Sequence, residues 1–469
     1  MPILKRAYQL KILPMRKYFK LADGVLDKKR LLLTMDDIDR GRPITISVIL
    51  PTFLSTIEEL EDYRYEVVRN ELVALGQLLS KGLIDEVVIV DGGRDENGEA
   101  DDRLVKQMIA SAYRSIPLFH DQADLLNKYP ALRDKAKLGL YDFGIRVIHQ
   151  SDPQVTHAVK KFRILSEDFP PGKGAGLWLA TGASFGDILA FFDSDIRSFQ
   201  GWHVASIIEP IINTFKEDEK RIEFVKAYYT RLSMNLDCPE RGFYMLGGRV
   251  KRLFMIPILK CLARHGILNG LEKLKYPLSG EFAGSRSLIE SLNFPKDYGI
   301  ETGMLVEIWK KGWVDKIAEA DLHIFQHFPR SDDLIEDMVS QIVNLLLFEL
   351  EGDIELNKEF ADEYLEEAYR EIELSEAIVD QSKIAISRDV KRTLYKDAEG
   401  DKLRVKAYSE ILREIISHKK ESPIKIFKMP PWKEVIKTLD GKNFQSFIRR
   451  RSAIYTLEIL NKLEIVSAD

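Results

Sequence analysis

Two carboxylates, Asp193 and Asp195, stand directly after an uninterrupted apolar run at 188–192. Such a run is typical of a strand buried on both faces of a parallel sheet. Alternate residues of an extended chain point the same way, so both carboxylates can reach one hard cation. Open α/β sheets bind their ligands at the carboxyl ends of strands. Aspartate is also common in turns, so this pattern alone fits an ordinary strand end equally well.

Two further stretches could bind anions. Lys173 lies in the sequence Pro-Pro-Gly-Lys-Gly, where glycines let backbone N–H groups and an ammonium approach a phosphate, although the same residues also suit an exposed turn. Arg249 follows Gly247 and Gly248 and precedes an apolar helical pattern at 250–262. Amides and a guanidinium at a helix start form an anion site, and an ordinary surface arginine is the alternative.

Three more titratable residues are candidates. Glu281 has small residues on both sides, which indicates either a tight site with close backbone approach or a plain turn. Glu301 begins a helical pattern, where the helix dipole by itself favours an acid. His323 and His327 are four residues apart near a predicted strand at 320–325. For them a lone metal-binding histidine and a packed or exposed histidine both remain open.

The elements that would position these residues alternate along the chain. Polar residues follow each of four predicted strands, which are 44–50, 84–90, 145–148 and 187–192. Helical patterns lie between them, so the sequence predicts an α/β fold with a doubly wound, mostly parallel sheet. After Arg330 we expect an all-α C-terminal extension of structural or oligomeric role, with helical patterns at 334–350, 358–374, 403–418 and 444–463.

Composition narrows the class of protein. The 469 residues suffice for about two or three domains, and a net charge of -5 argues against a general nucleic-acid binder. The two cysteines, Cys238 and Cys261, form no CxxC motif, which fits a reducing cytoplasm. Neither a signal-peptide core nor an apolar stretch of about 18 residues occurs, so we predict no membrane span. GxGxxG after a strand and GxxxxGK[ST] are both missing, which argues against dinucleotide-binding and P-loop folds.

Together these residues resemble the GT-A (nucleotide-diphospho-sugar transferase-like) glycosyltransferases, and more narrowly the retaining glucosyl-3-phosphoglycerate synthases. The resemblance runs from about Ile44 to His327. It depends on several motifs in one order, which are 170–174, 193–195, 226–229, 247–250, 277–283, 298–303 and His327. It implies transfer of glucose from a nucleotide-sugar, UDP-glucose, to 3-phosphoglycerate. Transfer of mannose, a glycerate acceptor, and a non-catalytic sugar-nucleotide-binding scaffold are the alternatives.

The resemblance also implies roles for particular residues. Lys173 and Asp193 would bind the donor, Glu281 would meet its sugar hydroxyls, and Asp195 and His327 would ligate Mg²⁺ or Mn²⁺. Asp195, Lys173 and Glu281 would be the catalytic group. The nucleoside would be held by Pro51, Thr52, Phe53, Ser55, Asp91 and Gly92. The acceptor would be bound by Gly248, Arg249 and Lys251.

This chain departs from the family at three places. Leu54 and Ser55 stand where acidic residues are usual, Lys251 replaces a hydroxyl residue, and Phe328 and Pro329 replace a polar Asn. The last change leaves the choice between 3-phosphoglycerate and glycerate open.

The resemblance divides the chain into four parts. These are an N-terminal arm (1–42), a nucleotide-sugar-binding half (43–200), an acceptor-binding half (201–330) and the helical extension (331–469). We expect a cytoplasmic protein that forms a homodimer and binds neither nucleic acid nor membrane.

Overall fold

The computed structural model describes most of the chain. The described residues are 21–22, 25–26, 44–53, 61–95, 97–138, 144–215, 221–234, 244–327, 331–354, 356–381, 394–395, 397–419 and 424–466. Of the expected N-terminal arm only β1 (Leu21–Ala22) and β2 (Val25–Leu26) are described, and these two strands pair antiparallel.

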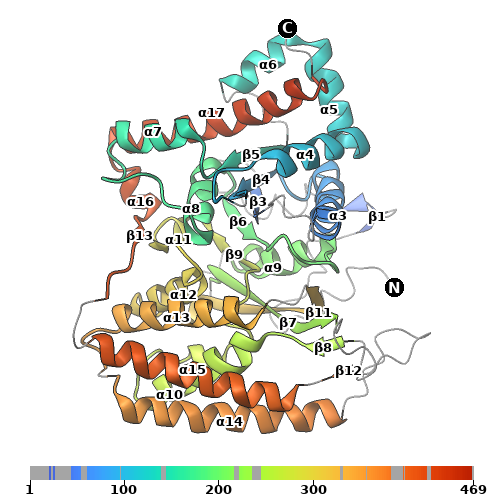
Figure 1. Ribbon diagram of the computed structural model, residues 1–469. Coiled ribbons are helices and arrows are strands. Elements are labelled where there is room, and N and C mark those ends of the chain that lie inside the picture. Colours follow the sequence, from blue (N-terminus) through green and yellow to red (C-terminus); the bar gives the residue numbers. More distant parts are fainter. Residues whose placement is uncertain are drawn as a thin grey trace.

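The described residues form one nine-stranded, mostly parallel sheet (Figure 1). Its parallel part contains, in spatial order, β5 (Ile145–His149), β4 (Glu86–Asp91), β3 (Ile46–Thr52) and β6 (Ile188–Phe191). These are the four strands expected from the β-branched and apolar runs, and the α/β class is therefore confirmed.

The sheet continues through strands of mixed direction. β9 (Phe282–Ser285) runs antiparallel between β6 and β7 (Phe224–Met234), and β11 (Ile317–His327) runs parallel to β7. The edge is completed by β8 (Tyr244–Leu246) and β12 (Leu394–Tyr395). A separate pair joins β10 (Phe294–Pro295) to β13 (Lys428–Met429).

Helices cover both faces of the sheet. Those before residue 265 are α3 (Glu61–Ser80), α4 (Arg103–Ser115), α5 (Pro117–Lys128), α6 (Pro130–Lys137), α7 (Pro153–Lys161), α8 (Lys173–Ala183), α9 (Gly201–Thr214), the π-helix η5 (Lys251–Met255) and α10 (Ile256–Arg264). The later ones are η6 (Leu271–Lys273), α11 (Arg286–Ile289), α12 (Ile300–Lys310), η7 (Val314–Lys316), α13 (Asp332–Glu349), α14 (Lys358–Gln381), α15 (Ala398–Lys419), α16 (Trp432–Val435) and α17 (Leu439–Lys462). Among the described helices, none is long and apolar enough to cross a bilayer.

Alternating side chains of β3 enter two separate cores. Ile46, Val48 and Leu50 pack into one core, and Ile49 packs into the core on the opposite face. The sequence of a strand is continuously apolar when both of its faces are buried in this way. The doubly wound arrangement predicted from the sequence is thereby confirmed.

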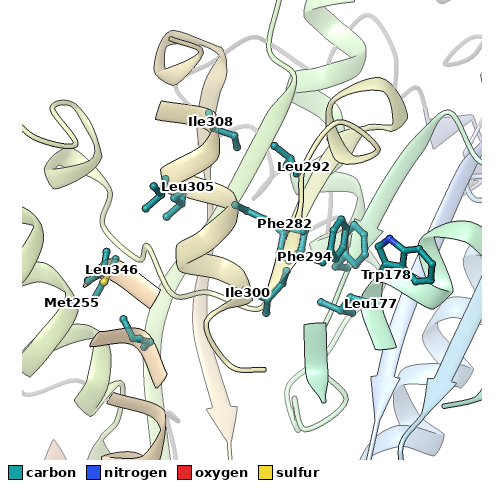
Figure 2. Close-up of a cluster of buried hydrophobic side chains, with 14 of the residues drawn as sticks. Leu177, Trp178, Met255, Phe282, Leu292, Phe294, Ile300, Leu305, Ile308 and Leu346 are labelled. Atoms are coloured by element: carbon teal, nitrogen blue, oxygen red, sulfur yellow. The ribbon is translucent and has the colours of Figure 1, made fainter. Parts of the chain in front are cut away.

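The second core connects the sheet to the C-terminal helices. Figure 2 shows Trp178 of α8, Phe282 of β9, Ile300 of α12 and Leu346 of α13 in this cluster of buried side chains. Phe282 also stacks on Phe191 of β6, with ring centroids 4.4 Å apart. Because α12 lies between the sheet and α13, its position is fixed from both sides.

The C-terminal region is helical as expected, but it differs from a single all-α extension in two ways. β12 and β13 are strands of two residues each, too short to leave a periodic signal, and they form only because β8 and β10 offer free edges. In addition, α15 packs against both α13 and α14, and α14 lies beside α10, whereas α17 lies at the other end of the molecule beside α7 and β5 (Figure 1). The last helix thus packs on the half that contains β3–β6.

Trp432 of α16 anchors this last segment. Its ring stacks on Trp178 with centroids 4.4 Å apart, and its Nε1 donates to the Trp178 carbonyl at 2.8 Å. In return, Trp178 Nε1 donates to the Pro430 carbonyl at 2.7 Å. A Cβ at Gly182 would lie 2.0 Å from the Trp432 ring, so only glycine fits there.

We predict that Trp432→Ala lowers the free energy of unfolding by about 3–5 kcal/mol, because a fully buried indole and the buried hydrogen bond that it donates are lost. Urea denaturation of the full chain measures this. The matched control is Trp313→Ala, which removes a partly exposed indole and should cost less than about 1.5 kcal/mol. Equal losses in the two variants would show that the C-terminal segment does not stabilise the sheet.

Candidate active site

Charged side chains gather where β3, β4 and β6 end. Asp193 and Asp195 follow β6, Lys173 begins α8, Glu301 lies in the first turn of α12, and His327 is the last residue of β11. The carboxyl edge of a parallel sheet is the usual ligand-binding position of such folds. Sequence segments more than 150 residues apart therefore supply one site.

Lys173 is the centre of this group. Its Nζ lies 2.7 Å from Asp193 Oδ1 and 2.7 Å from Glu301 Oε1, and the three side chains are only 16%, 21% and 6% exposed. Burial by itself lowers the pKa of Lys173, but the charges of Asp193 and Glu301 outweigh burial and raise this pKa above its usual value. The ammonium is thus fixed in its charged form between two carboxylates.

Glycines make this arrangement possible. Gly172 has φ of 136°, and a Cβ there would lie 2.3 Å from the Lys296 carbonyl oxygen. A Cβ at Gly280 would lie 2.3 Å from Asp193 Oδ2. Both positions require the absence of a side chain, so the Pro-Pro-Gly-Lys-Gly segment is a packed helix start and not an exposed turn.

Asp195 and His327 form a second pair. His327 Nδ1 lies 3.1 Å from Asp195 Oδ1, and Arg231 Nη2 lies 3.9 Å from Asp195 Oδ2. Burial lowers the pKa of His327, and the charge of Arg231 lowers it further, which keeps the imidazole in the neutral form that binds metals. The His327 side chain is fully buried, and its Nε2 has no hydrogen-bond partner among the described residues.

These two residues fit a divalent cation. Two ligands about 2.1 Å from one ion lie about 3 Å apart when they subtend a right angle, close to the observed separation. Within the described ranges no group of three or more His, Cys, Asp or Glu side chains could hold a metal. A cation here would therefore need further ligands from a bound molecule or water.

Glu281 is fully buried beside this pair. Tyr229 donates its hydroxyl to Glu281 Oε2 at 2.7 Å, and Ser279 donates to the Glu281 carbonyl at 2.7 Å. Burial, followed by the charge of Asp193, raises the pKa of Glu281 to about 7. Glu281 Oε1 is buried and has no hydrogen-bond partner in the part of the chain that the structure describes. It is therefore available to a ligand hydroxyl.

The residues expected around a nucleoside also come together. Thr52 donates to Asp91 Oδ1 at 2.7 Å, and Ser194 donates to the Pro51 carbonyl at 2.8 Å. Phe53 is 56% exposed, and a Cβ at Gly92 would lie 3.6 Å from its ring. Ser55 lies outside the described residues. An exposed aromatic ring beside a glycine suits the flat face of a base.

The residues expected at the acceptor surround a π-helical turn. Gly248 has φ of 70° and precedes Arg249, and η5 begins at Lys251. Lys251 Nζ lies 5.1 Å from the centroid of the Tyr276 ring, and burial lowers the pKa of this lysine to about 8. Arg249 contacts Asp332 of α13, so it is not an ordinary surface arginine. π-Helical turns occur frequently at functional sites.

Some contributors were not identified from the sequence. Arg231 sits beside Asp195, and Glu71 of α3 accepts a hydrogen bond from the Ile196 amide at 3.0 Å, which fixes the chain after Asp195. Neither belongs to a local motif. A buried acid in the middle of the amphipathic pattern of α3 was the only signal for Glu71.

The two histidines do not form a joint site. His323 has φ of 63° at a register shift in β11, and it pairs with Asp321 at 3.7 Å. Of the two histidines, only His327 lies beside Asp195 and could bind a metal together with it.

Comparison with known proteins agrees with the resemblance seen in the sequence. The glucosyl-3-phosphoglycerate synthase of Mycobacterium tuberculosis is 33% identical over 177 residues, which cover 38% of this chain and 52% of that protein. The protein of the same name from Petrotoga mobilis is 28% identical over 257 residues, covering 52% of this chain and 72% of the relative. The chain spans about half the length of the mycobacterial relatives that it matches. No protein-family model matches it.

Solved structures show the same likeness. The M. tuberculosis glucosyl-3-phosphoglycerate synthase in complex with Mn²⁺, UDP-glucose and phosphoglyceric acid is 25% identical, with a TM-score of 0.46. The match covers 71% of this chain and 86% of that chain. By its own sheet topology and side-chain geometry, this chain is a doubly wound α/β protein with a charged site at the carboxyl edge of its sheet. In sequence it is similar to glucosyl-3-phosphoglycerate synthases.

We predict that Lys173→Met lowers the free energy of unfolding by about 3–5 kcal/mol, because two buried carboxylates lose their shared cation. The matched control is Lys160→Met. Lys160 is 2.7 Å from Asp168, the same separation, but the side chains are 53% and 69% exposed. This variant should change stability by about 1 kcal/mol or less. Urea denaturation of both variants measures the two changes in the free energy of unfolding. Similar changes in both would show that the Lys173–Asp193–Glu301 group does not stabilise the fold more than an exposed ion pair does.

Proposed function

We propose that this chain is a retaining, divalent-metal-dependent glycosyltransferase of the GT-A class that transfers glucose from UDP-glucose to 3-phosphoglycerate. The observation that carries the proposal is the Asp195–His327 pair, 3.1 Å apart, at the same sheet edge as the Lys173–Asp193–Glu301 group. The similarity to glucosyl-3-phosphoglycerate synthases supports the choice of donor and acceptor.

The donor would lie along the ends of β3, β4 and β6. Thr52 and Asp91 would bind the uridine, the exposed ring of Phe53 would stack on it, and Pro51 and Gly92 would shape the backbone around it. Asp193 would contact the nucleotide while Lys173 holds that carboxylate in place. The buried Oε1 of Glu281 would accept a hydrogen bond from a sugar hydroxyl.

Asp195 and His327 would hold Mg²⁺ or Mn²⁺, which when bound stabilises negative charge on the departing diphosphate. Transfer breaks the bond between the anomeric carbon and the phosphate oxygen and forms a bond to the acceptor hydroxyl on the same face. The hydroxyl proton passes to the departing phosphate oxygen, so no protein nucleophile is needed. Lys173 keeps positive charge beside the site, because its ammonium stays protonated.

The acceptor would bind at the start of the helix that contains η5. Gly248 lets the backbone approach closely, and Arg249 and Lys251 supply positive charge for the phosphate and carboxylate.

The homodimer and the cytoplasmic location remain predictions from the sequence. Light scattering of the intact chain tests the first of them.

The proposal predicts turnover in a matrix of UDP- and GDP-sugars against 3-phosphoglycerate and glycerate. UDP-glucose with 3-phosphoglycerate should be the best pair, excess chelator should stop the reaction, and added Mg²⁺ or Mn²⁺ should restore it. Asp195→Ala should lower the rate by about two orders of magnitude or more, as expected when one major electrostatic group is lost. The exposed Asp315 provides the control, and Asp315→Ala should keep full activity.

Other outcomes of this matrix of donors and acceptors would favour the alternative functions. Preference for a GDP-sugar or for glycerate would favour the mannosyl or glycerate alternatives. Tight UDP binding without turnover of any donor would favour the sugar-nucleotide-binding scaffold. Full activity in excess chelator would contradict the role given to Asp195 and His327.

Lys251 should make acceptor binding depend on pH. Burial, and after it the charge of Arg252, lower the pKa of Lys251 to about 8 in the free protein. A bound anion favours the charged lysine and so raises this pKa. Affinity for 3-phosphoglycerate should therefore be constant between about pH 7, where the phosphate is already nearly dianionic, and about pH 8. Above pH 8 it should fall by at most about tenfold per pH unit.

Calorimetric titration of 3-phosphoglycerate at several pH values measures this dependence. Lys251→Met should bind the acceptor more weakly, with less dependence on pH. Lys226, whose pKa burial also lowers to about 8, is retained in that variant, so the difference between the two proteins isolates Lys251. If the affinity of the unchanged protein and that of Lys251→Met fall equally with pH above pH 8, Lys251 does not bind the acceptor.

A further inference from the structure

One carboxylate in the helical region holds two arginines. Asp332 Oδ1 accepts hydrogen bonds from Arg249 Nη1 and, at 2.9 Å, from Arg404 Nε. Asp332 Oδ2 accepts from Arg404 Nη2 at 3.1 Å. Arg404 thus donates two parallel hydrogen bonds to the carboxylate from its Nε–Nη2 edge. Arginine binds phosphates in the same bidentate way.

Three parts of the chain meet at this carboxylate. Arg249 precedes η5, Asp332 begins α13, and Arg404 belongs to α15 of the C-terminal region. The remaining Nη1 of Arg404 is held by Asp397 at 3.0 Å and by Asp401 at 3.3 Å. These two acids fix the orientation of the Arg404 guanidinium independently of Asp332.

The two arginine side chains are mostly covered, but that of their partner is exposed. The side chains of Arg249 and Arg404 are 12% and 14% exposed, whereas Asp332 is 46% exposed. Partial burial raises the pKa of Asp332, but the hydrogen bond from Arg404 and the charge of Arg249 outweigh it and lower that pKa below its usual value. The positive groups are therefore fixed, while the anion between them can be exchanged with little loss of packing.

We propose that Arg404 binds the acceptor together with Arg249, and that Asp332 occupies the position of the acceptor's phosphate until the acceptor displaces it. This inference builds on the proposed function, because it takes the phosphate of 3-phosphoglycerate as the displacing group. It assigns acceptor selection to the helical C-terminal region.

Charge gives the site its selectivity. A phosphomonoester carries nearly two negative charges at neutral pH, whereas Asp332 and the carboxylate of glycerate carry one each. Two guanidinium groups therefore favour a phosphorylated acceptor over glycerate. Glycerate lacks the additional charge needed to replace Asp332.

Two substitutions with opposite expected effects test the proposal. Asp332→Asn keeps the shape of the side chain but removes the competing charge, so the KM for 3-phosphoglycerate should fall by about three- to tenfold. Arg404→Gln should raise the same KM by about tenfold or more, and lower the preference for 3-phosphoglycerate over glycerate. Neither change should alter kcat or calorimetric binding of UDP.

Matched controls lie on the same two helices. Asp333 shares the first turn of α13, is exposed, and has no ion pair among those described, so Asp333→Asn should leave the KM unchanged. Arg413 lies on α15 with Arg404 and pairs with Asp362, so Arg413→Gln serves as the arginine control. A purely structural role for the Asp332 group would weaken binding in both test variants, and that result would overturn the proposal.

Binding of inorganic phosphate and of 3-phosphoglycerate, measured by calorimetry on the same variants, separates this inference from the proposed function. If transfer occurs but Asp332→Asn and Asp333→Asn bind phosphate equally, the two-arginine site is wrong and the enzyme assignment stands. If no transfer occurs but Asp332→Asn binds phosphate more tightly and Arg404→Gln more weakly, the anion site stands and the enzyme assignment fails. Thermal unfolding of each variant confirms that it is folded.

Discussion

The structure depends on one buried ion group, in which Lys173 is held between Asp193 and Glu301. These three residues come from the start of α8, the end of β6 and the first turn of α12, so the group joins three separate parts of the chain. Removing two carboxylates and an ammonium from water is costly unless their geometry is close to ideal. The glycines at 172 and 280, where a Cβ would collide with Lys296 and Asp193, are what allow that geometry.

This constraint extends outward from the site. Because α12 carries Glu301, the packing of α12 against the sheet and against α13 determines where Glu301 lies (Figure 2). The C-terminal helices are therefore part of the same structure and not an appendage. α13 supplies Asp332, α15 supplies Arg404, and α16 places Trp432 on Trp178 of α8, the helix that Lys173 begins.

Local patterns predicted much of the fold. Apolar and β-branched runs located β3, β4, β5 and β6 to within two residues at either end, and helical periodicity located α13, α14, α15 and α17. Asp193, Asp195 and Lys173 also stood out, because short polar residues and glycines directly follow or precede regular elements. In these cases the residues that form the local pattern are the same residues that determine the local structure.

What the sequence did not reveal depends on contacts between distant residues. Glu301 looked like an acid that stabilises a helix start, and only its contact with Lys173, 128 residues away, shows its second role. Arg231, Glu71, Asp332 and Arg404 belong to no motif, since their partners lie on other elements. α17 lies on the β3–β6 half, far from α15, where it packs on β5, α6 and α8. The preceding α16 is anchored there by Trp432 against Trp178 and Gly182, a contact that no periodicity marks.

A crystal structure of the chain with Mn²⁺ and UDP, with anomalous scattering used to locate the manganese, tests the central claim most directly. The account predicts one manganese between the Asp195 carboxylate and the His327 ring, with the diphosphate bound to it and the uracil beside Phe53. Manganese bound elsewhere, or UDP bound away from the carboxyl ends of β3, β4 and β6, would contradict it.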